Sequence, residues 1–336
     1  MRLERHWQHV TALGVVLYPL SLIFRAAAAI RRAAYAGGLR STERLPVPVI
    51  IVGNITVGGT GKTPLVLWLS EFLQQHGMTP AIVSRGYRTP VTAPRAVAPT
   101  SDPAQFGDEP VLLAQRSGAP VWVGADRVAV GRALLAAHPH TQVIISDVGL
   151  QHYRLHGDIK IAVVDGLRGL GNGLLLPSGP LREPVSRLSR ADAVVVNGGA
   201  HGSQIFPGAY TMRLEGREFR NVLNPDWIVG PDYFQSKRVR AVAGIGHPPR
   251  FFLHLHALGM QFEAAPFPDH YAYDADDLAW PEAEAIVMTE KDAVKCAAFA
   301  TEKFWALPVA AVPDRELGEL VLSKLNLKSR HEPSPA

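Results

Sequence analysis

A glycine-rich stretch of the chain has residue types and a spacing suited to binding phosphate. Its residues, in order, are Thr56, Val57, Gly58, Gly59, Thr60, Gly61, Lys62 and Thr63. The glycines let backbone N–H groups point inward at phosphate oxygens, and the lysine can reach the β- and γ-phosphates of a nucleotide. The Thr63 hydroxyl can bind Mg²⁺. We therefore predict that residues 56–63 bind a nucleoside triphosphate and its Mg²⁺ ion.

The segments on both sides of this turn support the interpretation. Residues 48–52 are a short apolar run rich in β-branched side chains, which predicts a buried strand. Residues 64–76 predict a helix, whose N-terminus adds positive potential at the phosphates. The apolar face of this helix consists of Leu65, Leu69, Phe72 and Leu73. Since the usual phosphate-loop pattern has Gly at the position of Thr56, the turn resembles the Gly-Gly-x-Gly-Lys-Thr variant of P-loop proteins; a glycine-rich turn with a chance lysine is the alternative.

Carboxylates supply candidates for the remaining chemistry. Asp147 ends an apolar run, where a P-loop enzyme keeps the carboxylate that holds Mg²⁺, although it could be only a turn residue. Asp108 and Glu109 stand at the start of a predicted helix, which they can cap. Alternatively they supply a general base, because an acceptor hydroxyl needs a carboxylate or histidine within hydrogen-bond reach. His270, far along the chain, could orient or share that proton.

Two further charged motifs have open interpretations. Residues 176–183, Leu-Pro-Ser-Gly-Pro-Leu-Arg-Glu, form a loop framed by Gly and Pro. Arg182 in this loop can neutralise phosphate charge, or it can pair with Glu183 in solvent. Residues 289–292, Thr-Glu-Lys-Asp, follow a predicted strand and start a helix, where they could be a capping turn and no more.

The elements that position these residues alternate between strand and helix. Further strands are predicted at residues 79–83, 121–123, 143–147, 159–164, 193–196, 238–243, 285–288 and 304–310, and helices at 126–137 and 248–258. This alternation predicts an α/β fold with a mostly parallel sheet and ligands at the carboxyl ends of its strands. The 336 residues are enough for two domains. We expect a P-loop NTPase-like domain at residues 44–205 and a second, smaller α/β domain at residues 206–330.

The N-terminal segment, residues 1–43, is apolar in its middle and carries arginines at both ends. Its apolar run, residues 10–24, is shorter than the ~20 residues of a full membrane span. Pro19 is expected to kink or break the helix. A signal peptide and a buried core helix are alternatives. The arginines, with Trp7 and Tyr18, favour a membrane-inserted or interfacial anchor whose body lies on the cytoplasmic side.

The composition limits the possible partners. The net charge is +4, and arginines crowd the first segment beside the apolar run. This placement favours an anionic membrane surface over nucleic acid. Cys296 is the only cysteine, which excludes an intrachain disulfide and a cysteine-cluster metal site. We therefore expect a membrane surface as a partner, no nucleic acid and no obligate protein partner.

Eight short motifs occur in order along the chain. They are VGNITVGGTGKTP (52–64), SRGY (84–87), GDEP (107–110), GLQHYRL (149–155), LPSGPLRE (176–183), GIGHPPRFF (244–252), FPDHY (267–271) and TEKDAVK (289–295). Together they closely resemble the motifs of the tetraacyldisaccharide 4'-kinases, the lipid A 4'-kinases of Gram-negative bacteria. The resemblance extends from the apolar N-terminal segment to about residue 310.

This resemblance implies an activity, a location and a role for each candidate residue. The activity is transfer of the γ-phosphate of ATP to the 4'-hydroxyl of a tetraacylated glucosamine disaccharide 1-phosphate, a lipid A precursor. The location is the cytoplasmic face of the inner membrane, with the N-terminal helix contacting the bilayer. By similarity, Lys62 and Thr63 serve ATP and Mg²⁺, Asp108 is the base acting with His270, Asp147 supports Mg²⁺, and Arg182 and Glu183 lie at the nucleotide site.

The chain departs from the family pattern at three positions. The family usually has two adjacent aspartates where this chain has Asp147 and Val148, and a valine cannot bind Mg²⁺. His247 replaces the usual Asn, and Arg88 stands where Gly is common. The first departure motivates an alternative function, an impaired pseudokinase that binds nucleotide or lipid without turnover. A membrane-surface P-loop ATPase is a further alternative, but it leaves the Asp108 and His270 motifs unexplained.

Overall fold

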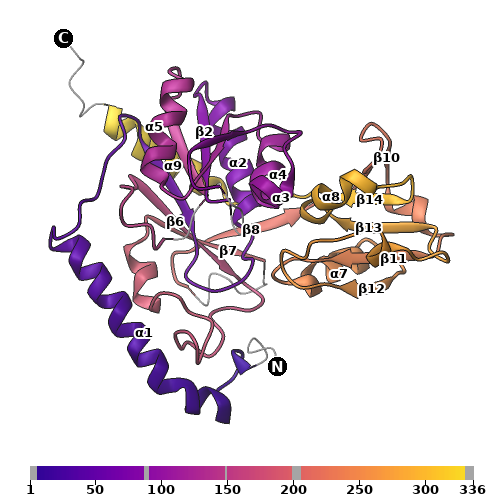
Figure 1. The fold of residues 1–336 in the computed structure, drawn as a ribbon, viewed down its shortest axis with the longest axis horizontal. Coiled ribbons are helices and arrows are strands. Elements are labelled where there is room, and N and C mark those ends of the chain that lie inside the picture. Colours follow the sequence, from indigo (N-terminus) through magenta and orange to yellow (C-terminus); the bar gives the residue numbers. More distant parts are fainter. Residues whose placement is uncertain (1–5, 87–90, 148–149, 199–205, 330–336) are drawn as a thin grey trace.

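The computed structural model describes residues 6–86, 91–147, 150–198 and 206–329 of the chain. Val148 and Arg88, two of the positions that depart from the family pattern, lie outside these residues. The structure has two sheets flanked by helices, and a long N-terminal helix lies along one side of the larger sheet (Figure 1). This arrangement confirms the predicted α/β fold with a mostly parallel sheet.

The larger sheet has nine strands. Their spatial order is β15 (Ala310–Pro313), β8 (Tyr210–Glu215), β7 (Ala193–Asn197), β6 (Ile159–Asp165), β1 (Val49–Gly53), β5 (Val143–Asp147), β2 (Pro80–Ser84), β4 (Val121–Val123) and β3 (Arg95–Val97). The strands from β8 to β4 pair in parallel, and the edge strands β3 and β15 pair antiparallel. The carboxyl ends of the parallel strands therefore meet at one edge, where ligands bind in such folds.

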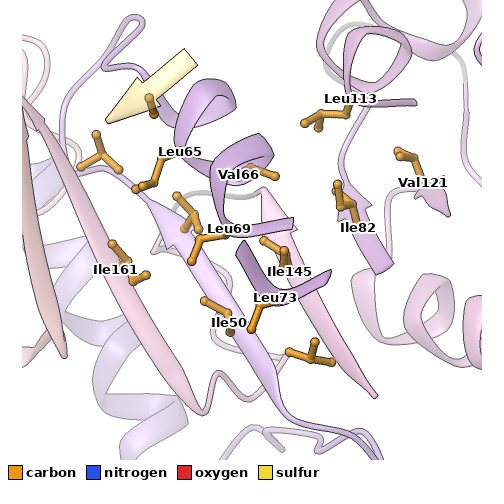
Figure 2. Close-up of a cluster of buried hydrophobic side chains, with 14 of the residues drawn as sticks. Ile50, Leu65, Val66, Leu69, Leu73, Ile82, Leu113, Val121, Ile145 and Ile161 are labelled. Atoms are coloured by element: carbon orange, nitrogen blue, oxygen red, sulfur yellow. The ribbon is translucent and has the colours of Figure 1, made fainter. Parts of the chain in front are cut away.

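The central strand β1 is apolar on both faces because helices or loops cover both sides of the sheet. Ile50 and Val52 pack on one face together with the apolar stripe of α2 (Lys62–Gln75), as Figure 2 shows for Ile50 and the α2 leucines. The same core includes side chains of α4 (Asp108–Arg116) and α9 (Arg315–Ser329). Val49 and Ile51 pack on the other face with α5 (Arg127–Ala137). The turn after β1 is thus held by two buried elements.

The smaller sheet has six strands and forms the second domain. Their spatial order is β10 (Ile228–Val229), β9 (Phe219–Asn221), β14 (Phe304–Leu307), β13 (Ala285–Thr289), β11 (Val239–Ala243) and β12 (Glu263–Pro266). Helices α7 (Pro248–Ala257) and α8 (Glu290–Cys296) belong to this domain. Separate apolar clusters lie on the two faces of the sheet, so the domain has a core of its own.

The boundaries of the second domain differ from the predicted range of residues 206–330. Strands β8 and β15 pair with each other at the edge of the larger sheet, and α9 packs into the larger core. The second domain is therefore residues 216–309, inserted between these two strands. The sequence pattern did not reveal this because the two strands pair across almost 100 residues of intervening chain.

Helix α1 (Ala12–Ala36) lies on the outside of the larger domain (Figure 1). It has 25 residues and spans about 38 Å, longer than the ~30 Å hydrocarbon core of a bilayer. By length and composition it can cross a membrane. Pro19 was predicted to kink or break the helix; the helix continues through Pro19, so a break is excluded, and the kink stays a prediction. Its exposed apolar residues include Val15, Val16, Ile23 and Ile30.

Polar side chains at two positions of α1 join it to the body of the protein. The hydroxyl of the buried Ser21 donates to the backbone carbonyl of Leu175 at 2.8 Å and accepts from the N–H of Ser178 at 3.1 Å. Farther along the helix, Arg32 forms an ion pair of 2.9 Å with Glu183. These contacts reach residues 175–183, so this segment is one place where the apolar helix is attached.

Candidate active site

The turn between β1 and α2 has the backbone of a phosphate loop. Gly58 and Gly61 have φ angles of 87° and 90°, a region that favours glycine. A Cβ atom on Gly61 would lie 2.1 Å from the amide nitrogen of Asn197, whose Nδ2 donates to the Thr60 carbonyl at 3.0 Å. Lys62 and Thr63 begin α2, directly after this turn. The predicted strand, glycine turn and helix are therefore all present.

A cavity of about 190 Å³ lies over the phosphate loop and between the two domains. Residues 59–64 line it from the larger domain together with Glu109 and Asp165. The second domain contributes His247 and Arg250 from the start of α7 and Lys291 from the start of α8. The cavity thus collects cationic side chains from both domains, Lys62, Arg250 and Lys291, around the turn that is predicted to bind phosphates.

The structure brings Asp108 and His270 together although they belong to different domains. Nδ1 of His270 lies 3.0 and 3.1 Å from the two carboxylate oxygens of Asp108. Asp108 is the first residue of α4 and is buried, and it follows Gly107, whose φ of 94° favours glycine. Burial raises the pKa of Asp108, but the hydrogen bond with His270 and the charge of Lys291 outweigh it and lower the pKa to about 2. The carboxylate is therefore ionised at neutral pH, as a general base must be.

Asp147 ends β5 next to β1, and its carboxylate is buried. Its Oδ1 atom has no hydrogen-bond partner among the residues that the structure describes. Burial and the nearby charge of Glu109 raise its pKa to about 7, against the opposing charge of Lys62. A buried carboxylate oxygen without a partner, close to the phosphate loop, fits a bound cation. Among the described residues, no group of three His, Cys, Asp or Glu is arranged to hold a metal by itself.

Arg182 and Glu183 are not brought to the phosphate-loop cavity. Their side chains line a second cavity of about 390 Å³, between α1 and the larger domain, with Phe24, Ala27, Ala28, Arg31, Gln151, Tyr153 and Leu176. Glu183 accepts hydrogen bonds from Arg32 and from the Tyr153 hydroxyl. The backbone of this loop supports the phosphate loop: the N–H of Arg182 donates to the Ile55 carbonyl at 2.7 Å.

A charged cluster around Asp165 was missing from the predicted site. Arg250 donates to Asp165 at 2.6 Å and to the Asn197 carbonyl at 3.0 Å, and so joins the second domain to the larger one. Arg168 donates to the same carboxylate at 3.2 Å and to the carbonyls of Gly59 and Gly246. Asp165 is the last residue of β6, so a strand-end carboxylate beside the phosphate loop was the available signal.

The Thr-Glu-Lys-Asp motif combines its predicted role with an unpredicted one. The Thr289 hydroxyl accepts from the N–H of Asp292 at 3.2 Å, which confirms the capping turn. The side chain of Lys291, however, extends to the larger domain, where its ammonium donates to Glu109 at 3.0 Å. His247, which replaces the usual Asn of the family, lies with its Nδ1 3.7 Å from Asp165, and burial lowers its pKa.

A glycine-rich turn of this kind after the first strand of a parallel sheet, with an aspartate at the end of the neighbouring strand, is the arrangement of P-loop phosphotransferases. The fold and the site therefore define the class as a P-loop phosphotransferase. A family model described as tetraacyldisaccharide-1-P 4'-kinase matches residues 13–326. The chain belongs to this family.

Relatives support the same assignment over almost the whole chain. A tetraacyldisaccharide 4'-kinase of Methylobacillus flagellatus is 49% identical over 323 residues, which cover 96% of this chain and 95% of the relative. One of Nitrosococcus oceani is 47% identical and covers 96% of this chain and 93% of its own length. A crystal structure of LpxK from Aquifex aeolicus in complex with ATP has a TM-score of 0.76 and 30% identity, and covers 93% of this chain and 99% of that one.

Proposed function

We propose that this protein transfers the γ-phosphate of ATP to the 4'-hydroxyl of a tetraacyldisaccharide 1-phosphate, a step of lipid A biosynthesis. The contact between Asp108 and His270 carries the proposal, because an acceptor hydroxyl needs a base within reach of its proton. Asp108 precedes Glu109, which lines the cavity over the phosphate loop. The names of the relatives and the ATP in the Aquifex structure support the acceptor and the donor.

In this reaction the sugar oxygen attacks the γ-phosphorus, and the bond from that phosphorus to the bridging oxygen of ADP breaks. Asp108 accepts the proton of the hydroxyl, and His270 orients the carboxylate through its Nδ1 contact. Lys62, at the start of α2, offsets charge on the β- and γ-phosphates. Thr63 and Asp147 would hold Mg²⁺, which supplies further positive charge to the phosphates when bound.

The membrane part of the proposal comes from α1. A helix with exposed apolar residues and flanking arginines can insert into a bilayer at the cytoplasmic face of the inner membrane. The second cavity lies between this helix and the larger domain, with the apolar Phe24 and Ala28 on one side and Arg182 on the other. An acylated phosphosugar could therefore reach the protein without its acyl chains leaving the membrane.

The first test is transfer of labelled γ-phosphate from ATP to tetraacyldisaccharide 1-phosphate in detergent micelles. We expect transfer by the unmodified protein, and a loss of about 10²–10⁴-fold in Asp108→Asn, the range over which a general base contributes. A Val148→Asp variant belongs in the same assay. Transfer by this variant alone would make the natural chain an impaired member of its family. Absence of transfer by both folded proteins would refute the proposed acceptor.

A further inference from the structure

Lys291 lies at the point where the two domains meet beside the base. Its ammonium is 3.0 Å from Glu109 Oε1 and 3.9 Å from Asp108 Oδ2, both in α4 of the larger domain. It is also 3.5 Å from Asp269 and 3.4 Å from Nε2 of His270, both in the second domain. The side chain is 15% exposed, so these contacts are largely shielded from water.

Lys291 is positively charged in this environment. Burial alone would lower its pKa, but the carboxylates of Glu109, Asp108 and Asp269 outweigh burial and raise the pKa well above the ordinary value. An ammonium has three N–H donors and no acceptor. Whatever nitrogen atom lies within hydrogen-bond distance of it must therefore accept.

This constraint determines which nitrogen of His270 carries the proton. Nε2 lies 3.4 Å from the ammonium and 3.9 Å from the Asp269 carboxylate, so the ammonium is the nearer of the two groups. Because an ammonium can only donate, Nε2 accepts from it, and Nδ1 is left as the nitrogen that donates. Nδ1 is the atom that faces both carboxylate oxygens of Asp108, so His270 donates to Asp108. The Asp108 carboxylate is then held ionised and in one orientation by Nδ1 of His270, while Nε2 of the same ring is held by Lys291.

We propose that Lys291 is a positioning residue of the transfer reaction, which holds His270 in the tautomer that donates to Asp108. This inference rests on the proposed function, since it assigns a role around the same base. The Thr-Glu-Lys-Asp turn then has a role beyond capping α8, because it places Lys291 at the interface between the two domains. It also makes the orientation of the base depend on contact between the domains.

Two kinetic results are expected from replacing Lys291. In Lys291→Met, kcat for phosphate transfer falls by about 10–10²-fold, as expected when a catalytic group loses its orientation, while KM for ATP changes less than about twofold. In Lys291→Arg, which keeps a charged donor, most of kcat returns. A large rise in KM for ATP with an unchanged kcat would show that Lys291 binds nucleotide instead, and would overturn the inference.

Arg116→Met is the matched control. Arg116 pairs with Glu290 and so also joins α4 to α8, but its ion pair includes neither Asp108 nor His270. If Lys291 merely holds the two helices together, Arg116→Met should lower kcat as much as Lys291→Met. If Lys291 acts through His270, the control keeps kcat near that of the unmodified protein. Lys291→Gln replaces Lys291→Met if the latter does not fold.

A double-mutant cycle separates action through His270 from independent action. In a His270→Ala background, Lys291→Met should cost little further kcat, because the group that it positions is gone. If the two substitutions instead lower kcat independently, so that their fold-losses multiply in the double variant, the inference is refuted. Imidazole nitrogen NMR gives a readout without turnover: the unmodified protein should show the Nδ1–H tautomer at His270, and an Nε2–H tautomer there would also refute it. If the unmodified protein transfers no phosphate, the proposed function fails; if it transfers and these signatures are absent, only the role of Lys291 fails.

Discussion

Gly246 offers a test of how closely the second domain must approach the phosphate loop. A Cβ atom at this position would lie 2.1 Å from the backbone nitrogen of Gly59 and 2.9 Å from its Cα atom. Real Cβ atoms essentially never approach other heavy atoms within 3.0 Å, so Gly246→Ala must separate the two backbones by about 0.9 Å. The contacted atoms are backbone, and no side chain can rotate away.

The expected result is a large loss of activity with little loss of stability. A misplacement of about 1 Å near a reacting group can cost about 10²-fold in rate, and we expect a loss of that order in kcat/KM for Gly246→Ala. The residue has no positive φ angle, so alanine is not strained there by the backbone itself. We expect the melting temperature to change by about 2 °C or less.

The assay is phosphate transfer at several ATP concentrations, together with thermal unfolding. Gly230→Ala serves as the control, because Gly230 belongs to the same domain, has a φ of −84° and has no atom within 4 Å of the point that a Cβ atom would occupy. It should keep the kcat/KM of the unmodified protein. A Gly246→Ala protein with unmodified kcat/KM would show that the approach of the two backbones is not needed for transfer, and the reasoning would be wrong.

Three further predictions concern the loop, the anchor and the domain interface. Lys62→Ala should lower kcat by about 10²–10³-fold with an unchanged circular dichroism spectrum, and normal turnover would contradict the phosphate-loop assignment. Ser21→Ala removes the hydrogen bonds of that hydroxyl with Leu175 and Ser178 and should cost about 1–3 kcal/mol of the free energy that holds α1 in place. Faster proteolysis of α1 is the readout, and an unchanged rate would contradict the prediction. Arg250→Ala leaves the buried Asp165 with one partner fewer and should lower the free energy of unfolding by about 3 kcal/mol in denaturant. The control, Arg315→Ala, removes an exposed ion pair and should cost less than about 1 kcal/mol. Equal costs would refute the importance of burial.

Local patterns in the sequence were sufficient to predict the elements that hold the site. The apolar run before the glycine turn and the stripe of leucines after it are β1 and α2. Their burial follows from the period of the apolar residues, which is a property of neighbouring positions. The strand that ends at Asp147 was predicted for the same reason.

Contacts between the domains were beyond the reach of these patterns. The Asp108 and His270 pairing came from a resemblance to a family, and no spacing along the chain requires it. Lys291 and Arg250 start helices of the second domain, and their targets depend on how two separate sheets meet. The side chain of Arg182 was expected at the nucleotide. Its loop contacts the phosphate loop through the backbone, and the side chain lines the cavity beside α1 instead.

The insertion of the second domain between β8 and β15 has a consequence for synthesis on the ribosome. Helix α1 precedes the larger sheet along the chain, and this sheet lacks its edge strand β15 and the packing helix α9 until the inserted domain has been made. Roughly 270 residues separate the end of α1 from β15, which corresponds to about 15–55 s of elongation. The membrane contact proposed for α1 therefore has this time to form before the larger sheet is complete.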